Sequence, residues 1–330
     1  MNRRSFHRVL ATAGSAVLGS NWAKTMPTDQ PDPGFPNLPL PTFGGVQFWA
    51  DELFFHDLHI QRNVLTGHHR LLDGENIRHA WGTYEQCHGR LEAIKRERGL
   101  PPMSGTAVVL LHGLIRSASN MRPLARYMKG QGGFSVFNVN YPSTRAGIAD
   151  HAAQLHRILS RLEGVEKIHL VAHSLGNIVI RHYWHEQTDA AKKLVPDPRI
   201  ERLVMVGPPN QGAKIAEMLA RNPLAEIIFG SPGQDFARRW DDLSPKLATP
   251  TIEFGIVAGG RGNNKGYNPL LGEDNDLIVT VESAKLCGAR DFLVLPVLHT
   301  FMMDDLAVKR ATLSFLRHGY FRTAEQRQPL

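Results

Sequence analysis

Short apolar runs recur along the chain from about residue 106 onward, and helix-like segments separate them. Most of these runs are continuous and rich in Val, Ile and Leu, which is typical of strands covered on both faces. Strands of this kind with helices between them predict an α/β fold with a mostly parallel, doubly wound sheet. The predicted strands are 107–111, 134–140, 167–172, 202–206, 252–257 and 291–295, and the clearest helices are 148–162 and 175–185.

Three other segments add to this plan. Residues 59–65 and 68–72 flank Thr66-Gly67 and predict an antiparallel hairpin that would start the sheet. Residues 85–98 predict a charged helix that Gly99 and two prolines end. The interruption at 207–250 is the longest, and its partly apolar stretches 212–220 and 223–229 predict a small helical lid.

The N-terminus has the layout of an export signal. Arg3, Arg4 and Arg8 precede an apolar stretch at 9–19, and the first acidic residue is Asp29. The paired arginines resemble a bacterial twin-arginine signal, so residues 1–26 are expected to direct export to the periplasm or medium. The stretch is shorter than the roughly 20 residues of a membrane span. Its cleavage site is poorly marked, which leaves retention as an uncut membrane anchor open.

Prolines at 27, 31, 33, 36, 39 and 41 predict an extended linker over 27–45, followed by one domain over 46–330. The chain has 38 basic and 31 acidic residues and a net charge of +7. Residues 1–26 hold four of the basic residues and no acid, so the remainder carries only +3. Without a long Lys/Arg run elsewhere, a nucleic-acid partner is not expected. Cys87 and Cys287 have no zinc or redox spacing and are expected to be isolated, buried thiols, although export would permit them to pair.

The segment 168–180 combines a strand, a tight turn and an apolar helix, with Ser174 at the apex. Such a turn needs small residues two positions before and two after the serine, and Ala172 and Gly176 supply them. A serine hydroxyl becomes a good nucleophile only when a base takes its proton and an acid orients that base. This pattern predicts Ser174 as a catalytic nucleophile.

The acid and the base are expected downstream, after late strands. His299 follows the strand predicted at 291–295 and is the predicted base. Asp276 follows the strand at 252–257 and competes with its neighbours Asp274 and Glu273. We favour Asp276 because the apolar run 277–279 would anchor its backbone in the core. His173, beside the nucleophile, is interpreted as structural.

A serine that attacks a carbonyl group also needs two backbone N–H groups aimed at the oxyanion that develops in the transition state. Leu175 directly follows Ser174 at a helix N-terminus and is one predicted donor. Leu114 is the other, because Gly113 lets the main chain after the strand at 107–111 approach closely.

These motifs together resemble the α/β-hydrolase fold, and within it the bacterial lipase and esterase group, from Ala107 to about Phe315. The corresponding motifs are 111–114, 172–176, 275–279 and 298–299, and loops 141–143 and 209–212 are similar to loops of that group. The resemblance implies a serine esterase or lipase that needs no cofactor and no metal. Ala172 departs from the commoner Gly. The segment 46–99 has no counterpart, and its six histidines match no familiar metal-ligand spacing.

The expected substrate is a small-molecule or lipid ester, with transient contact to a membrane or lipid surface left open. No pattern specifies an oligomeric state. A thioesterase, an amidase or a phospholipase on the same triad is the alternative, because acylation chemistry barely distinguishes leaving groups. A catalytically silent scaffold that binds an apolar ligand is the alternative from another class.

Overall fold

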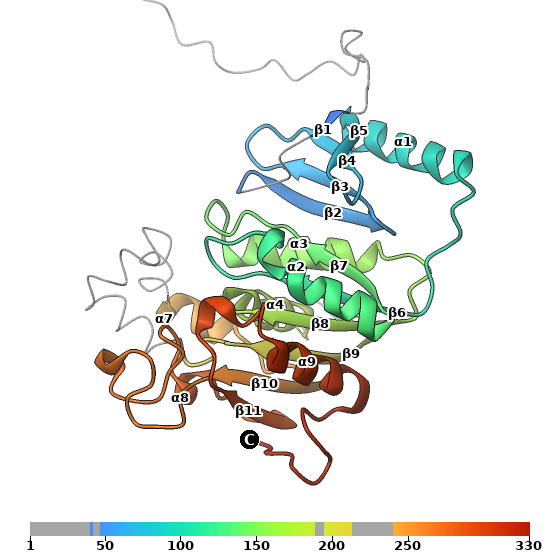
Figure 1. Ribbon diagram of the computed structural model, residues 1–330. Helices are drawn as coiled ribbons and strands as arrows, with labels where there is room; N and C mark the ends of the chain where they lie inside the picture. Colours follow the sequence, from blue (N-terminus) through green and yellow to red (C-terminus); the bar gives the residue numbers. More distant parts are fainter. Residues whose placement is uncertain (1–39, 42–46, 189–194, 213–239) are drawn as a thin grey trace, which may run out of the picture. The chain divides into compact units, whose positions relative to one another are not determined.

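The computed structural model describes residues 40–41, 47–188, 195–212 and 240–330 (Figure 1). The predicted signal at 1–26 and most of the linker at 27–45 lie outside these residues, as does the centre of the predicted lid. Within the predicted linker, β1 (Leu40–Pro41) pairs antiparallel with β5, so the end of that segment belongs to a sheet.

A six-stranded, wholly parallel sheet forms the centre of the structure, in the order β11-β10-β9-β8-β6-β7. Its core-facing positions are almost all buried, which is why the apolar runs are continuous. All six predicted strands are present within a few residues of their expected ends. Their bounds are β6 (Thr106–Leu111), β7 (Ser135–Val139), β8 (Lys167–His173), β9 (Ile200–Val206), β10 (Glu253–Gly259) and β11 (Asp291–Leu295).

Helices cover both faces of this sheet, so it is doubly wound as predicted (Figure 1). One face packs against α3 (Ile148–Ser160) and α4 (Leu175–Gln187), and the other against α2 (Ala118–Tyr127) and α9 (Leu306–His318). The short elements are η1 (Met128–Gly132), α7 (Trp240–Leu243), η2 (Ser244–Lys246), η3 (Pro269–Leu271), α8 (Val281–Ala284) and η4 (His299–Phe301).

The strand order reverses between β6 and β8. The chain leaves β6 toward α2 on one face and leaves β8 toward α4 on the opposite face. Two chain segments that leave neighbouring strand ends toward opposite faces have a crevice between them. Doubly wound sheets bind their ligands in such a crevice. The predicted oxyanion loop and the predicted nucleophile follow these two strands.

The N-terminal segment corrects one prediction. The hairpin exists, as β3 (Leu58–Asn63) and β4 (His69–Leu72), but it belongs to a separate antiparallel sheet and does not start the parallel one. That sheet also contains β2 (Trp49–Phe55) and β5 (Ile77–Gly82), and α1 (Tyr84–Glu97) packs on it. The reason is that β2 forms backbone pairs with β3 along its whole length. Within the described residues, its only backbone hydrogen bond toward β7 joins Asp51 N–H to Asn140 O, just beyond that strand.

The two cysteines are free, as the expected isolated thiols would be, but only Cys87 is buried, and Cys287 is exposed, which corrects that expectation. Burial raises the pKa of the Cys87 thiol to about 12, so it stays protonated. Among the described helices, none combines the length and the apolar character that crossing a bilayer requires.

Candidate active site

Ser174 lies on a sharp turn between β8 and α4. Its backbone has φ 53° and ψ −121°, a conformation that non-glycine residues rarely adopt. Hydrogen bonds with Val206 and Asn177 stabilise this strained backbone conformation. The Ser174 N–H donates to Val206 O (2.9 Å), and the Asn177 N–H donates to Ser174 O (3.0 Å). The buried Asn177 amide donates to the carbonyl oxygens of Ala172 (3.2 Å) and Ser174 (3.0 Å).

Gly176 is required by close approach to the neighbouring strand. A Cβ at this position would lie 2.8 Å from Leu111 O and 2.9 Å from His112 O, and both are backbone atoms that cannot rotate away. The small residue expected two places after the serine is therefore explained by packing of α4 against the end of β6.

Gly176→Ala is expected to lower the free energy of unfolding by about 1–3 kcal/mol, because the new methyl group overpacks this contact. Gly89→Ala in α1 is the matched control, since a Cβ there meets nothing within 4 Å. That control should leave stability unchanged or raise it by up to about 1 kcal/mol. Urea unfolding of both variants measures the difference, and equal midpoints would contradict the packing argument.

Asp276 and His299 form a buried pair. His299 Nδ1 lies 2.7 Å from Asp276 Oδ2, and the two residues are 5% and 1% exposed. The other carboxylate oxygen, Oδ1, accepts the N–H groups of Ile278 (3.0 Å) and Val279 (2.6 Å). The His299 N–H also donates to Asp276 O (2.9 Å), so backbone and side chain are both fixed.

The structure brings Ser174 close to this pair. Val206, which accepts the Ser174 N–H, is followed by Gly207, and a Cβ on Gly207 would lie 3.1 Å from His299 Cε1. Within the described residues no hydrogen bond joins Ser174 Oγ to His299. Such bonds are often long before substrate binds.

His173 holds the loop that carries His299, the predicted base. It is fully buried, and its Nε2 donates to the carbonyl oxygen of His299 at 3.1 Å. Burial lowers the pKa of His173 well below its usual value, so the ring is neutral. The expectation that His173 is structural fits this role, although the pattern did not indicate that it would hold the loop of His299.

Two unpartnered backbone N–H groups lie beside the serine. Within the described part of the chain, the N–H groups of Leu114 and Leu175 donate no hydrogen bond. A Cβ on Gly113 would lie 3.0 Å from Ser174 Cβ and 3.5 Å from its Oγ, so the loop before Leu114 passes against the Ser174 side chain. Leu114 and Leu175 also line one cavity of about 570 Å³.

That cavity is amphipathic and adjoins the predicted lid. Its apolar wall includes Ile148 and Leu243, and its polar wall includes Arg145, His182 and Lys246. Residues 213–239 of the predicted lid lie outside the described part of the chain, whereas both ends of the predicted lid segment are described. The ring of Trp240 lies so close to Gly212 that a Cβ there would be 2.4 Å from it.

Arg181 holds both ends of this insertion to α4, a role that no sequence pattern indicated. Its guanidinium donates to the carbonyl oxygens of Asn210 (3.0 Å), Leu247 (3.1 Å) and Ala248 (3.1 Å). Burial lowers the pKa of Arg181 to about 10, which leaves it charged near neutral pH. A buried cation that binds three carbonyl oxygens fixes where the insertion leaves and rejoins the body of the fold.

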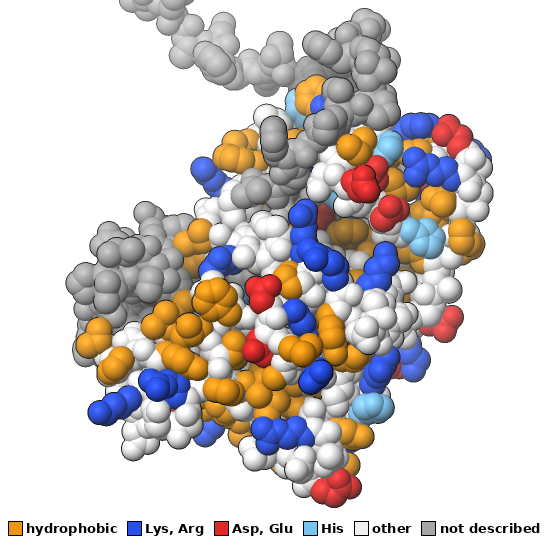
Figure 2. All heavy atoms as spheres, viewed as in Figure 1, with side chains coloured by type: hydrophobic (Ala, Val, Ile, Leu, Met, Phe, Trp, Pro, Cys, Tyr) orange, Lys and Arg blue, Asp and Glu red, His pale blue; other side chains and the backbone are white. Residues whose placement is uncertain are grey.

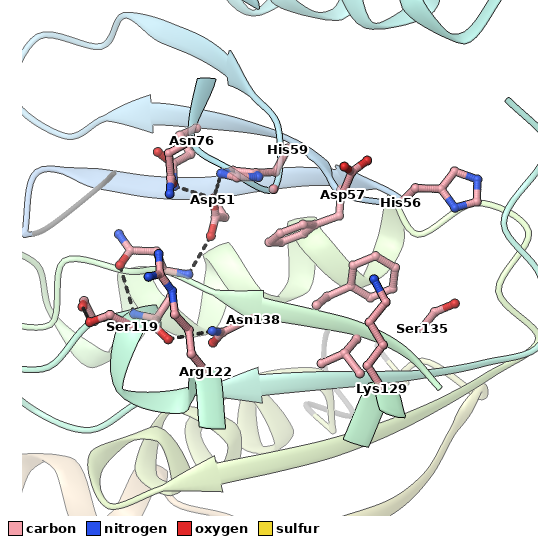
Figure 3. Close-up of a pocket in the computed structure, with 18 of the residues that line it drawn as sticks. Asp51, His56, Asp57, His59, Asn76, Ser119, Arg122, Lys129, Ser135 and Asn138 are labelled. Atoms are coloured by element: carbon pink, nitrogen blue, oxygen red, sulfur yellow. Dashed lines mark hydrogen bonds and ion pairs between the residues drawn. The ribbon is translucent and has the colours of Figure 1, made fainter. Parts of the chain in front are cut away.

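A larger cavity of about 730 Å³ contains none of the five predicted site residues. It lies between the antiparallel sheet and α2, where Figure 2 shows basic side chains on one side of a hollow and acidic and histidine side chains on the other. In Figure 3, Arg122 and Lys129 enter it from below, opposite Asp51 and His59. Asp51 is 1% exposed and burial raises its pKa, although His59 and two hydrogen bonds favour the charged form.

The six histidines of the N-terminal segment contact separate partners and do not converge. Within the described residues, no group of three or more His, Cys, Asp or Glu side chains is placed to hold a metal ion. His79 pairs with Asp73 at 2.8 Å, His69 with Glu52 at 3.3 Å, and His68 stacks on Trp81. These contacts stabilise the antiparallel sheet.

Several buried histidines make the fold sensitive to acid. Burial lowers the pKa of His112, His151 and His169 to about 4. In the unfolded chain a histidine takes up its proton near pH 6.5, while these three remain neutral in the fold. The free energy of unfolding is therefore unaffected by these histidines above about pH 6.5. It falls as the pH drops from 6.5 toward 4, by roughly 1.4 kcal/mol per pH unit for each histidine.

Urea unfolding between pH 7.5 and 4.5 should show this loss. In His169→Gln the slope of stability against pH should be smaller by roughly 1.4 kcal/mol per pH unit, because the titration of one buried histidine is removed. An unchanged slope in that variant would show that His169 does not contribute.

A parallel, doubly wound sheet with a serine on a strand–turn–helix elbow defines the class of the α/β-hydrolase fold. A family model described as the alpha/beta hydrolase family matches residues 108–311, which is more than half of the chain. The chain therefore belongs to the alpha/beta hydrolase family, and the predicted fold class is confirmed. Among curated proteins no match was found.

Several solved structures resemble the chain at low sequence identity. The product of the gene lin2722 from Listeria innocua is 15% identical, with 67% of this chain and 96% of that chain covered and a TM-score of 0.44. Naproxen esterase from Bacillus subtilis is 16% identical, with 65% of this chain and 85% of that chain covered and a TM-score of 0.37. Phospholipase PlaB from Legionella pneumophila is 18% identical, with 55% of this chain and 45% of that chain covered and a TM-score of 0.41.

Proposed function

We propose that this protein is a serine hydrolase that cleaves carboxylic esters through an acyl-serine intermediate. The observation that carries the proposal is the buried Asp276–His299 pair, 2.7 Å apart, close to a serine on a strained elbow. A carboxylate that accepts Nδ1–H leaves Nε2 of the imidazole free to act as a base.

In the proposed reaction, Ser174 Oγ attacks the ester carbonyl carbon and His299 Nε2 takes the hydroxyl proton. The negative charge that forms on the carbonyl oxygen is stabilised by the N–H groups of Leu114 and Leu175. The imidazolium then gives its proton to the departing alcohol, which leaves Ser174 acylated. Water then attacks the acyl carbon while His299 Nε2 takes a proton from it. The imidazolium returns that proton to Ser174 Oγ as the acyl–oxygen bond breaks, which releases the carboxylic acid and restores the free serine.

The cavity beside Leu114 and Leu175 supports small substrates. At about 570 Å³ it is within the usual range for small-molecule sites and fits an ester with a short to medium acyl group. Its mixture of apolar and charged walls supports a substrate with one apolar and one polar part. Thioester, amide and phospholipid substrates remain alternatives on the same residues.

Labelling with a fluorophosphonate probe tests the proposal directly. The probe should modify the wild-type protein at Ser174 and leave Ser174→Ala unmarked, because only an activated serine displaces fluoride. Hydrolysis of p-nitrophenyl acetate, butyrate and octanoate, compared with a thioester and an anilide, then separates ester cleavage from its alternatives. Absence of labelling would favour the silent binding scaffold.

A further inference from the structure

The loop that carries Leu114 is held by a side chain outside the triad. His112 directly follows β6 and is fully buried, and its Nδ1 lies 2.8 Å from the carbonyl oxygen of Gly113. Its ring stacks on Tyr141, with centroids 4.0 Å apart and planes inclined by 9°. Tyr141 also donates its hydroxyl to His112 O, so ring and backbone of His112 are both fixed by one neighbour.

These contacts admit one protonation state of His112. A carbonyl oxygen only accepts hydrogen bonds, so Nδ1 must carry a proton. The backbone N–H of Tyr141 points at Nε2 (3.4 Å), so Nε2 must be the bare acceptor. In an imidazolium, or in the other neutral tautomer, Nε2 would carry a proton that points at the Tyr141 N–H.

This tautomer fixes the orientation of one peptide group. In a trans peptide, the Gly113 carbonyl and the Leu114 N–H point in opposite directions. The Gly113 oxygen is held toward His112 and also accepts the Arg116 N–H at 3.4 Å. The Leu114 N–H must therefore point to the other side of the peptide. Gly113 lies against Ser174 in this loop, and the Leu114 N–H has no partner among the described residues.

We propose that His112, in its Nδ1–H form, is a positioning residue that aims the Leu114 N–H at the oxyanion. The inference rests on the proposed function and names one part of its machinery. His112 does not touch the reacting atoms and acts only through the Gly113–Leu114 peptide.

The surroundings keep this state over the working pH range. Burial lowers the pKa of His112 to about 4, and the neighbouring His151 lowers it further, while the Gly113 oxygen has the opposite effect. His173 also interacts electrostatically with His112, and burial keeps His173 neutral. No carboxylate is among the groups that shift the pKa of His112, so no described acidic side chain stabilises the imidazolium.

A matched pair of variants tests the proposal. Asn and Leu have nearly the same shape, and neither reaches the Tyr141 N–H as the imidazole does, so His112→Asn and His112→Leu should lose similar stability, about 1–3 kcal/mol. Only Asn retains a donor at the position of Nδ1. We expect the kcat of His112→Leu to be at least 10-fold below that of His112→Asn, with similar KM values. The reason is that complete removal of one oxyanion donor lowers kcat by about 10²–10³-fold.

Phosphonylation by the fluorophosphonate should follow the same order, because the phosphoryl oxygen occupies the oxyanion position. Equal kcat and equal phosphonylation rates in the two folded variants would overturn the proposal. If the wild type is not labelled at all, the proposed function fails instead, so the two failures are distinguishable.

A measurement on the wild type covers the case in which either variant does not fold. In protein labelled with ¹⁵N-histidine, the nitrogen shifts of the buried His112 ring should show a protonated Nδ1 and a bare Nε2 from pH 5.5 to 8. Tyr141→Phe removes the hydroxyl donor while keeping the aromatic ring stacked on His112. The ring nitrogen signals that move in this variant are assigned to His112. A protonated Nε2 would overturn the proposal.

Discussion

Ser174→Ala is expected to reduce ester hydrolysis by about 10⁶-fold in kcat, the largest effect of any single change. Without Oγ no acyl-serine can form, and the reaction must use water directly. The elbow itself should persist, because the Ser174 hydroxyl forms no hydrogen bond within the described structure and its backbone is held by Val206 and Asn177. The remaining oxyanion donors would leave a small rate above that in water.

Steady-state kinetics with p-nitrophenyl acetate measure this loss, and a thermal unfolding midpoint near that of the wild type shows that the fold is intact. Ser119→Ala is a suitable control, since Ser119 is exposed and lines the other cavity. A turnover in Ser174→Ala within 10-fold of wild type would show that another group performs the attack.

Asp276→Asn is expected to lower kcat by about 10⁴-fold. The structure explains why the amide cannot substitute. Asp276 Oδ1 accepts two backbone N–H groups, so the amide oxygen must take that place and the NH₂ group must face His299. Nδ1 of His299 would then have to accept a hydrogen bond, which moves its proton to Nε2, and Nε2 can no longer take the proton of Ser174.

Asp274→Asn is the matched control, because the same substitution is made two residues away. Asp274 accepts the backbone N–H groups of Arg261 (2.7 Å) and Gly262 (2.8 Å) and forms no hydrogen bond with His299. Loss of one of these bonds should loosen that loop and change kcat less than 10-fold. Comparison of kcat for the two variants decides between the carboxylates, and the reverse order would make Asp274 the acid.

The parallel sheet and the order of its strands along the chain were predictable because the relevant signals are local. A buried strand is a continuous apolar run, and the elbow is a strand, a small residue, Ser174 and a helix within 13 positions. The choice of Asp276 over Asp274 also began from a local feature, the apolar run after it. Its stated reason was backbone anchoring, and the structure adds that Asp276 Oδ1 accepts the N–H groups of Ile278 and Val279.

The sheet to which the N-terminal hairpin belongs was not predictable in the same way. Pairing of β3 with β2 instead of with the parallel sheet depends on which strand edges meet in space. Between β2 and the end of β7, the only backbone hydrogen bond within the described residues joins Asp51 to Asn140. The exposure of Cys287 has the same origin, since burial of one side chain depends on what packs over it.

The sequence by itself determined the fold class, because strand-forming runs and turns are encoded by neighbouring residues. It also indicated three candidate site residues that follow parallel strands, Ser174, Asp276 and His299. Tertiary structure alone decided which of the sixteen histidines support the site. His112, His173 and Arg181 act through carbonyl oxygens that lie up to 126 residues away in sequence, as for His173 and His299. A hydrogen bond to a backbone carbonyl requires no particular residue type at the acceptor, so it leaves no pattern in the chain, and only the folded arrangement of the strands reveals it.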